Sequence, residues 1–188
     1  MRDRRPKTCR PLKAARAILI SVCLCVSCWS CTDAALRAKP SDSDEMKQRA
    51  IAQMSAKNKR SYPDVPELSP EEAAGMQAAG EVVFVDVREL EEFTVSHLPG
   101  AIHVDTFEKE TEQYRDAKVI AYCTIGYRSG FYAAKLRKKG IDAYNLSGSI
   151  LSWVHAGRPI VDKDGETKRL HVYGRKWDLA PAGYDTVW

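Results

Sequence analysis

Residues 118–128, Lys-Val-Ile-Ala-Tyr-Cys-Thr-Ile-Gly-Tyr-Arg, are the stretch from which the fold can be worked out. Lys118 to Tyr122 is a mostly apolar run, which predicts a strand buried on both faces. Residues 129–139 carry apolar side chains at helical spacing and are followed by Gly140, a natural helix stop. Cys123 to Arg128 therefore forms a short loop between a buried strand and a helix. In open α/β sheets such a loop lies where ligands bind.

The composition of this loop predicts a reactive thiolate at Cys123. Arg128 supplies a fixed positive charge, and the helix beginning near Ser129 adds the positive end of its dipole. Gly126 allows the backbone to curl tightly, so that loop amides can turn toward the sulfur. The alternative is an inert buried cysteine, which would need neither the glycine nor the arginine.

The surrounding sequence alternates strands with short helices. Ser69-Pro70-Glu71-Glu72 predicts a helix start with a capping box. Val82 to Val87 predicts a second strand buried on both faces, and shorter strands are expected at residues 101–104 and 143–146. The predicted fold class is α/β, with a central parallel sheet and helices on both of its faces.

The first 31 residues resemble an export signal. Seven of the first sixteen residues are Lys or Arg and one is Asp, so residues 17–188 carry a net charge of −2 within a chain of +4. A short apolar run follows at residues 17–26, too short to span a bilayer comfortably. The basic charge thus belongs to the N-terminus, and no nucleic-acid partner is expected.

The cysteines divide sharply between this segment and the rest of the chain. Five of the six lie within residues 1–31, and Cys123 alone lies in the predicted domain, which excludes a disulfide inside it. Cys28 after Ser27, or Cys31 after Ser30, resembles the lipidated cysteine of bacterial lipoproteins. The expectation is an exported, periplasmic or cell-envelope protein anchored to the membrane by lipid; plain secretion and an uncleaved anchor remain alternatives.

Three motifs in order resemble the single-domain rhodaneses, which are sulfurtransferases. Cys123 to Arg128 matches the family's active-site pattern. Val85-Asp86-Val87-Arg88, with Glu92-Phe93 and residues 96–101, matches its upstream signature, and residues 146–153 with Gly157-Arg-Pro159 match its closing segment. Thr124 departs from the pattern, since many active members have a second arginine there, and Ser96 stands where glycine is usual.

The resemblance implies transfer of a sulfane sulfur through a persulfide on Cys123. The donor would be a small anion such as thiosulfate and the acceptor a thiol, with Arg128 holding the donor. Asp86 and Arg88 either orient the loop or form a structural salt bridge. The predicted binding loop consists of Thr124, Ile125, Gly126, Tyr127 and Ser129.

Two other functions remain as alternatives. Phosphatases and arsenate reductases of the same fold have one more residue between cysteine and arginine, so the four-residue spacing here disfavours them. A non-catalytic binding module is favoured by Thr124 and by the aromatic C-terminus. The four histidines show no ligand spacing, so neither a metal site nor a cofactor is expected.

The predicted organisation has four parts: residues 1–31 as the export segment, 32–66 as a polar tether, 67–161 as the rhodanese-like domain and 162–188 as a C-terminal extension packing on it. Within the tether, Met46, Ala50, Ile51 and Met54 recur at helical spacing, and both a packed helix and a loose spacer are compatible with this. Asp164-Gly165 predicts a hairpin between residues 160–161 and 170–172. The extension forms either an irregular tail or a lid near Cys123.

Overall fold

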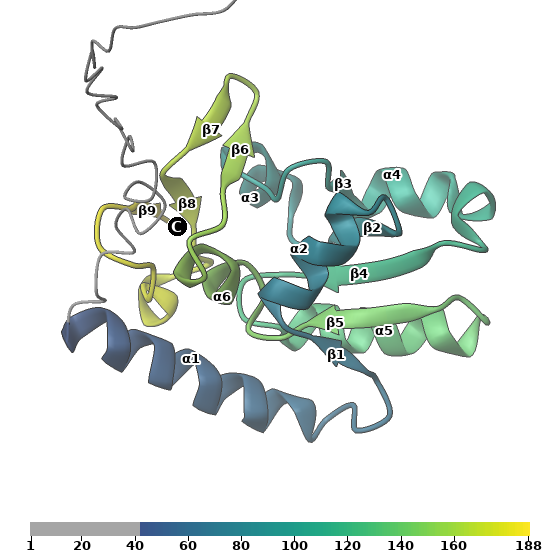
Figure 1. Cartoon of the computed structure of the whole chain (residues 1–188), viewed down its shortest axis with the longest axis horizontal. Helices are drawn as coiled ribbons and strands as arrows, with labels where there is room; N and C mark the ends of the chain where they lie inside the picture. Colours follow the sequence, from purple (N-terminus) through teal and green to yellow (C-terminus); the bar gives the residue numbers. More distant parts are fainter. Residues whose placement is uncertain (1–41) are drawn as a thin grey trace, which may run out of the picture. The chain divides into compact units, whose positions relative to one another are not determined.

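The computed structural model describes residues 42–188, in which five parallel strands form the central sheet in the order β1-β5-β4-β2-β3 (Figure 1). The sheet strands are β1 (Glu67–Leu68), β2 (Val82–Asp86), β3 (Ile102–His103), β4 (Lys118–Tyr122) and β5 (Ala143–Leu146). The helices are α1 (Asp42–Lys59), α2 (Pro70–Ala78), α3 (Leu90–Val95), α4 (Val104–Lys109), α5 (Tyr127–Lys138) and α6 (Ser149–His155), with 3-10 turns at Thr111–Tyr114 and Arg175–Trp177.

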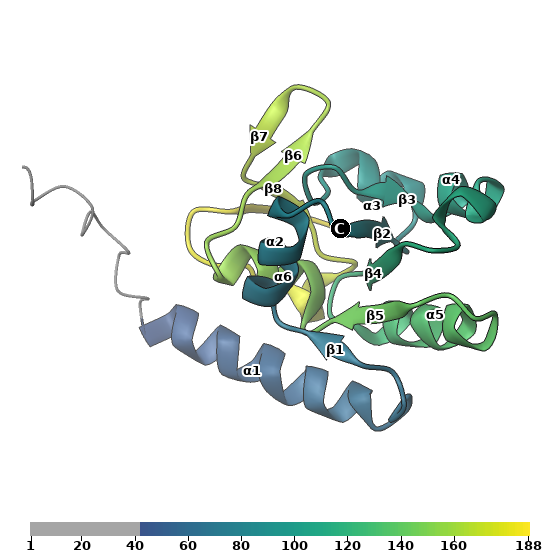
Figure 2. The ribbon, with the colours of Figure 1, turned by 45° about the vertical axis from the view of Figure 1, so that its right-hand side comes forward.

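The alternation of side chains along β4 explains why helices cover both faces of the sheet. Val119 and Ala121 are buried in one cluster with Leu136 of α5. Ile120 and Tyr122 are buried on the other face, in a cluster with Trp153 of α6. Successive strand residues point to opposite faces, so an apolar run of this kind needs a helical layer on each side. The predicted α/β fold with a central parallel sheet is confirmed, and Figure 2 shows α2 and α6 on the face opposite α5.

The predicted capping box at the start of α2 is present. The Glu72 amide donates to Ser69 Oγ at 3.2 Å, and the Ser69 amide donates to Glu72 Oε2 at 2.8 Å. These two bonds satisfy backbone donors that the first helical turn leaves without a partner. The start of the helix is therefore specified locally, independently of the sheet.

Of the two possibilities left open for the tether, a packed helix and a loose spacer, residues 42–66 take the first. They form α1 and the loop that follows it. Ile51 of α1, and Tyr62 and Val65 of the loop, are each no more than 4% exposed. Tyr62 packs directly on Gly130 of α5, where a Cβ would lie 2.2 Å from the tyrosine ring. The apolar residues at helical spacing, together with these aromatic and aliphatic contacts, make this segment part of the folded body.

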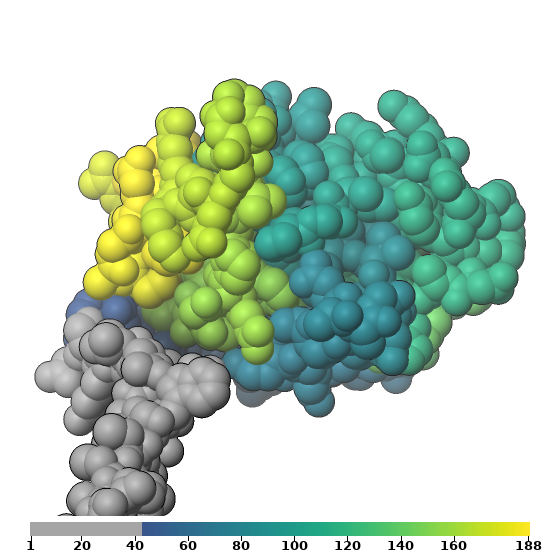
Figure 3. Space-filling model, turned by 45° about the horizontal axis from the view of Figure 1, so that its top comes forward, coloured from purple at the N-terminus to yellow at the C-terminus, as the bar shows by residue number. Residues whose placement is uncertain are grey.

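The C-terminal extension forms two small pairs of strands. The turn at Asp164-Gly165 joins β6 (Ile160–Asp162) to β7 (Gly165–Thr167), and not to residues 170–172 as the sequence predicts. Those residues belong largely to β8 (Arg169–His171), which pairs in parallel with β9 (Asp185–Val187). Leu170 and Val172 are fully buried in the cluster that contains Tyr122. In Figure 3 the extension, yellow-green to yellow, covers one end of the visible face.

The predicted export segment and its cysteines, Cys28 and Cys31, lie outside the described residues. Between residues 42 and 188, no helix is both long enough and apolar enough to cross a membrane.

Candidate active site

Cys123 lies directly after β4, at the point where the chain turns into α5. Its side chain is almost fully buried, at 1% exposure, and its Sγ accepts a hydrogen bond from the Gly126 amide at 3.2 Å. Gly126 has a φ of +94°, a conformation that strains any residue with a Cβ. The glycine thus lets the loop close around the sulfur, and the N-terminus of the twelve-residue α5 begins beside it.

The surroundings of Cys123 favour the thiolate. Burial is the largest single influence and raises the pKa of the thiol, because it removes water from the charged form. The Ser129 hydroxyl, the Arg128 charge and loop amides act in the opposite direction and together outweigh burial. The pKa of Cys123 therefore lies below its usual value, as expected of a nucleophilic cysteine.

Arg128 is held by a carboxylate. Its two terminal nitrogens donate to Glu92 Oε2 at 2.6 Å and to Glu92 Oε1 at 2.9 Å, and it also contacts Thr124 Oγ1 at 3.3 Å. The Glu92 side chain is 3% exposed and that of Arg128 is 28% exposed. This two-point pairing fixes the guanidinium beside the loop. Its charge acts on Cys123 from this position, and the donor-holding role implied by the family resemblance stays a prediction.

Glu92 remains ionised in this partly buried pair. Burial raises the pKa of its carboxyl, but hydrogen bonds from Arg128 and the Glu89 amide, together with the charges of Arg128 and Arg88, lower it below the usual value. The sequence singled out Glu92 only as part of a signature. Its role as the partner of Arg128 needed the tertiary structure, because the two residues are 36 positions apart.

A cluster of buried polar side chains supports the other side of the sulfur. Ser129 Oγ lies 3.5 Å from Cys123 Sγ, and it donates to Asn145 Oδ1 at 2.6 Å. A hydroxyl has one proton, so the shorter contact with Asn145 competes with the contact to sulfur. Ser149 Oγ accepts from the Cys123 amide at 3.0 Å. Asn145 and Ser149 were not among the predicted site residues.

Backbone strain and the α1 segment also contribute to this cluster. Ser149 has a φ of +53°, unusual for a residue other than glycine and typical of functional sites. The Tyr62 hydroxyl donates to the Gly126 carbonyl at 2.9 Å, and Asn145 Nδ2 reaches the same oxygen at 3.3 Å. Residues on β5, α6 and the loop after α1 thus hold the cysteine loop in place.

Asp86 and Arg88 form a buried salt bridge beneath the C-terminal extension. Both side chains are 0% exposed, and Arg88 Nη2 lies 2.7 Å from Asp86 Oδ2. Arg88 also donates to the backbone carbonyls of Ser96 at 2.5 Å and His171 at 3.4 Å. Of the two roles considered, these contacts favour the structural one, since the pair ties β2 to the chain around Ser96 and to β8.

The C-terminal extension reaches the rim of the cysteine loop. His171 Nδ1 lies 3.7 Å from Glu92 Oε1, and the Arg128 guanidinium lies 5.0 Å from the centre of the Tyr173 ring. Tyr173 in turn meets Trp177 edge to face, with ring centres 5.2 Å apart. The extension therefore passes from the Arg128 side of the loop toward Trp177, in addition to packing on the core.

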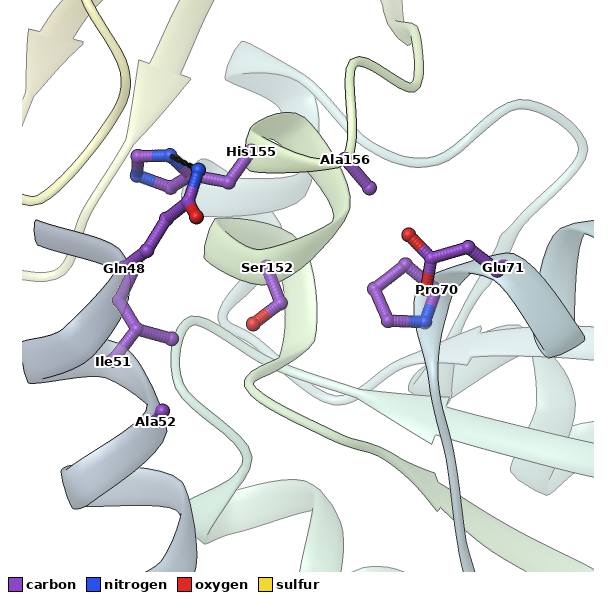
Figure 4. Close-up of a pocket in the computed structure, with 8 residues that line it drawn as sticks. All are labelled: Gln48, Ile51, Ala52, Pro70, Glu71, Ser152, His155 and Ala156. Atoms are coloured by element: carbon purple, nitrogen blue, oxygen red, sulfur yellow. Dashed lines mark hydrogen bonds between the residues drawn. The ribbon is translucent and has the colours of Figure 1, made fainter. Parts of the chain in front are cut away.

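The predicted loop residues differ in accessibility. Thr124, Ile125 and Ser129 are buried, whereas Tyr127 is 50% exposed. Among residues 42–188, no group of three or more His, Cys, Asp or Glu side chains is arranged to hold a metal ion. The cavity drawn in Figure 4, of about 250 Å³ between α1, α2 and α6, contains none of the loop residues.

The comparisons with known proteins point to one family. A family model described as "Rhodanese-like domain" matches residues 69–156. The chain is 39% identical over 93 residues to a tRNA sulfurtransferase from Desulfurococcus amylolyticus, covering 46% of this chain and 19% of that protein. Among solved structures, a thiosulfate sulfurtransferase from Pseudomonas aeruginosa aligns with a TM-score of 0.49 and 23% identity, covering 64% of this chain and 23% of that one.

A smaller relative is matched over most of its length. The chain is 34% identical over 98 residues to the thiosulfate sulfurtransferase GlpE from Actinobacillus succinogenes, which covers 50% of this chain and 88% of that protein. The chain spans about a fifth of the length of the tRNA sulfurtransferase. With the family match and the cysteine loop, this similarity shows that the chain belongs to the rhodanese-like family, which includes sulfurtransferases.

Proposed function

We propose that the protein is a sulfurtransferase that carries a sulfane sulfur as a persulfide on Cys123. The observation that carries the proposal is the position of Cys123 Sγ, 3.2 Å from the Gly126 amide and beside the N-terminus of α5. These groups favour an anionic sulfur and would equally favour the terminal sulfur of a persulfide. The expected donor is a small anion such as thiosulfate, and the expected acceptor is a thiol.

The proposed first step is attack of the Cys123 thiolate on the outer sulfur of thiosulfate. A bond forms between Sγ and that sulfur while its bond to the sulfonate sulfur breaks, and the electron pair leaves with sulfite. Arg128 contributes positive charge near the site while paired with Glu92. In the second step an acceptor thiolate takes the outer sulfur and Cys123 returns to the thiolate, so the enzyme undergoes no net oxidation.

The test is intact mass spectrometry after incubation with thiosulfate. The wild-type chain should gain the mass of one sulfur atom, which a thiol acceptor should then remove. Cys123→Ser should gain none. Equal sulfur uptake by both proteins would place the chemistry elsewhere, and no uptake by the wild-type chain from thiosulfate or from an organic persulfide would refute the proposal.

A non-catalytic binding module is the second candidate, because Cys123 is only 1% exposed. On this alternative the loop and extension present a surface to a partner, and the thiol is never loaded. Labelling with iodoacetamide in the native state separates the two. Alkylation of Cys123 well below pH 8.5 supports catalysis, whereas a thiol that reacts only after denaturation supports the binding module.

We further propose that residues 1–31 direct export to the periplasm or cell envelope and that Cys28 or Cys31 becomes lipidated there. The basic stretch followed by a short apolar run and small residues supports this. Mass spectrometry of the mature N-terminus from cells should show diacylglycerol on one of these cysteines. An unmodified cleaved terminus would indicate plain secretion, and an intact terminus an uncleaved anchor.

A further inference from the structure

A cavity of about 440 Å³ lies beside the cysteine loop, and neither Glu92 nor Arg128 is among the residues that line it. Seven residues line it: Met54, Lys57, Asn58, Ile125, Tyr127, Lys176 and Trp177. Two of them, Ile125 and Tyr127, belong to the loop that holds the sulfur. The volume is within the range of sites for small organic ligands.

The walls of this cavity are largely apolar. Met54 and Trp177 are partly buried and pack against the hydrophobic cluster that contains Ile125. Tyr127 is half exposed, so its ring is available to a ligand. An aromatic or aliphatic body would bury apolar surface against these side chains, which is favourable in proportion to the area removed from water.

The cavity also carries two positive charges that lack acidic partners. Lys57 and Lys176 are exposed, and within residues 42–188 neither has a carboxylate in ion-pair contact. Lys176 lies 5.5 Å from the centre of the Trp177 ring. By contrast, Arg128, which does not line the cavity, is paired with Glu92. Lys57 and Lys176 are therefore available to an anionic ligand in the cavity.

The segments that complete the cavity lie outside the matched family domain. Met54, Lys57 and Asn58 come from α1, and Lys176 and Trp177 come from the C-terminal extension, whereas the family match covers residues 69–156. Asn58 Nδ2 also approaches the Ile125 carbonyl at 3.5 Å. The two added segments thus meet at the loop, where they can alter which substrate is accepted.

We infer that this cavity binds the sulfur acceptor and that the acceptor is a small organic thiol with an apolar body and a carboxylate. The inference rests on the proposed sulfur transfer. The acceptor thiolate attacks the outer sulfur of the Cys123 persulfide, and a new sulfur–sulfur bond forms on the acceptor. The bond to Sγ breaks, and its electron pair remains on Sγ. The lysines bind the carboxylate, and the apolar walls bind the body.

The turnover test compares two acceptors of similar shape, 4-mercaptobenzoate and the uncharged 4-methylbenzenethiol, with the persulfide-loaded enzyme. Substituting both lysines, Lys57→Gln with Lys176→Gln, should lower the ratio of kcat/KM for the charged over the uncharged thiol by about tenfold, because exposed charge interactions are individually weak. An unchanged ratio would overturn the inference.

Lys118→Gln is the matched control. Lys118 is also an exposed lysine, but it lies at the opposite end of β4 from Cys123. This substitution should leave the ratio within twofold. An equal fall in the control and in the double variant would show that overall charge, and not the cavity, selects the acceptor, which would also contradict the inference.

A binding measurement separates this inference from the proposed function. Titration calorimetry with 4-(methylthio)benzoate, which has no free thiol, requires no sulfur transfer. The wild-type chain should bind it, and the double lysine variant should bind it about tenfold more weakly. If the wild-type chain binds this compound but forms no persulfide on Cys123, the sulfurtransferase proposal is refuted and the cavity remains a binding site. If a persulfide forms but the compound does not bind, the proposed acceptor site is refuted and the sulfurtransferase proposal stands.

Discussion

The two flanks of the cysteine loop differ in how their charges are satisfied. On one flank, Arg128 is bound at two points by Glu92, with His171 and Tyr173 of the extension nearby. On the other, beside the cavity, Lys57 and Lys176 have no carboxylate in ion-pair contact within residues 42–188. The first arrangement is paired and partly desolvated, whereas the second is exposed and open to a ligand.

We infer from this difference that a cation beside the cysteine loop can serve either of two purposes. A paired, partly buried arginine contributes a fixed field and structural support, because breaking the pair leaves a charge poorly compensated. An exposed lysine without a partner stays hydrated at little cost in free energy, and it can bind an incoming anion. The five predictions below test this division and the contacts of the loop, from the largest expected effect to the smallest.

Glu92→Gln should have the largest effect on stability. It removes the charge that compensates Arg128 in a site where the carboxylate is 3% exposed. Because Arg128 is partly exposed, we expect a loss of about 2 kcal/mol, below the range for fully buried pairs. Urea unfolding measures it, with Lys57→Gln as the control on the open flank, expected within about 0.5 kcal/mol of wild type. Equal losses in both would remove the distinction between the flanks.

The stabilising effect of Glu92 should also depend on pH. The pKa of its carboxyl is lower in the folded chain than usual, so its contribution is complete above the ordinary glutamate pKa and is lost as pH falls through the folded value. The stability difference between wild type and Glu92→Gln should therefore shrink in acid. A difference that grows as the pH falls would contradict the pairing.

Ser129→Ala should raise the pKa of Cys123, because the hydroxyl contact is one of the causes that lower it. It also removes the 2.6 Å bond to Asn145, which should cost about 1 kcal/mol of stability. The pH dependence of iodoacetamide alkylation reports the pKa. If the pH midpoint of alkylation is unchanged, the lowered pKa of Cys123 is due to Arg128 and the loop amides alone.

Asn145→Leu tests whether Asn145 competes with the sulfur for the Ser129 proton. Without the amide oxygen, the hydroxyl can turn toward Sγ, so the pKa of Cys123 should fall further. The same substitution made in a Ser129→Ala background should have no such effect. A shift that persists there would mean that Asn145 acts by holding the Gly126 carbonyl instead.

Tyr173→Leu should have the smallest effect. It removes the ring that lies 5.0 Å from the Arg128 guanidinium, a contact worth about 0.5–1 kcal/mol at an exposed site. Thermal unfolding should show a slightly lower Tm. If the substitution also increases native-state alkylation of Cys123 severalfold, the extension shields the sulfur; if it does not, Tyr173 serves packing alone.

The sequence predicted those parts of the site that depend on residues close together in the chain. Buried strand, cysteine loop and helix occur consecutively between Lys118 and Lys138, so their arrangement needed only strand and helix patterns. The capping box of α2 is equally local. The partners of the loop are different, since Glu92, Asn145 and Tyr62 lie 36, 16 and 64 positions from the residues they contact there. No local pattern encodes such a pairing.

The sequence by itself determined the α/β class, the cysteine loop and its spacing to Arg128, because these depend on periodicity and on adjacent residues. Only the tertiary structure decided that Arg128 is occupied by Glu92, that residues 42–66 pack on the body and that the extension reaches the loop. Each of these depends on which distant side chains can share a buried contact. The free energy of burying these side chains and pairing their charges determines which contacts form. That free energy depends on the fold of the whole chain.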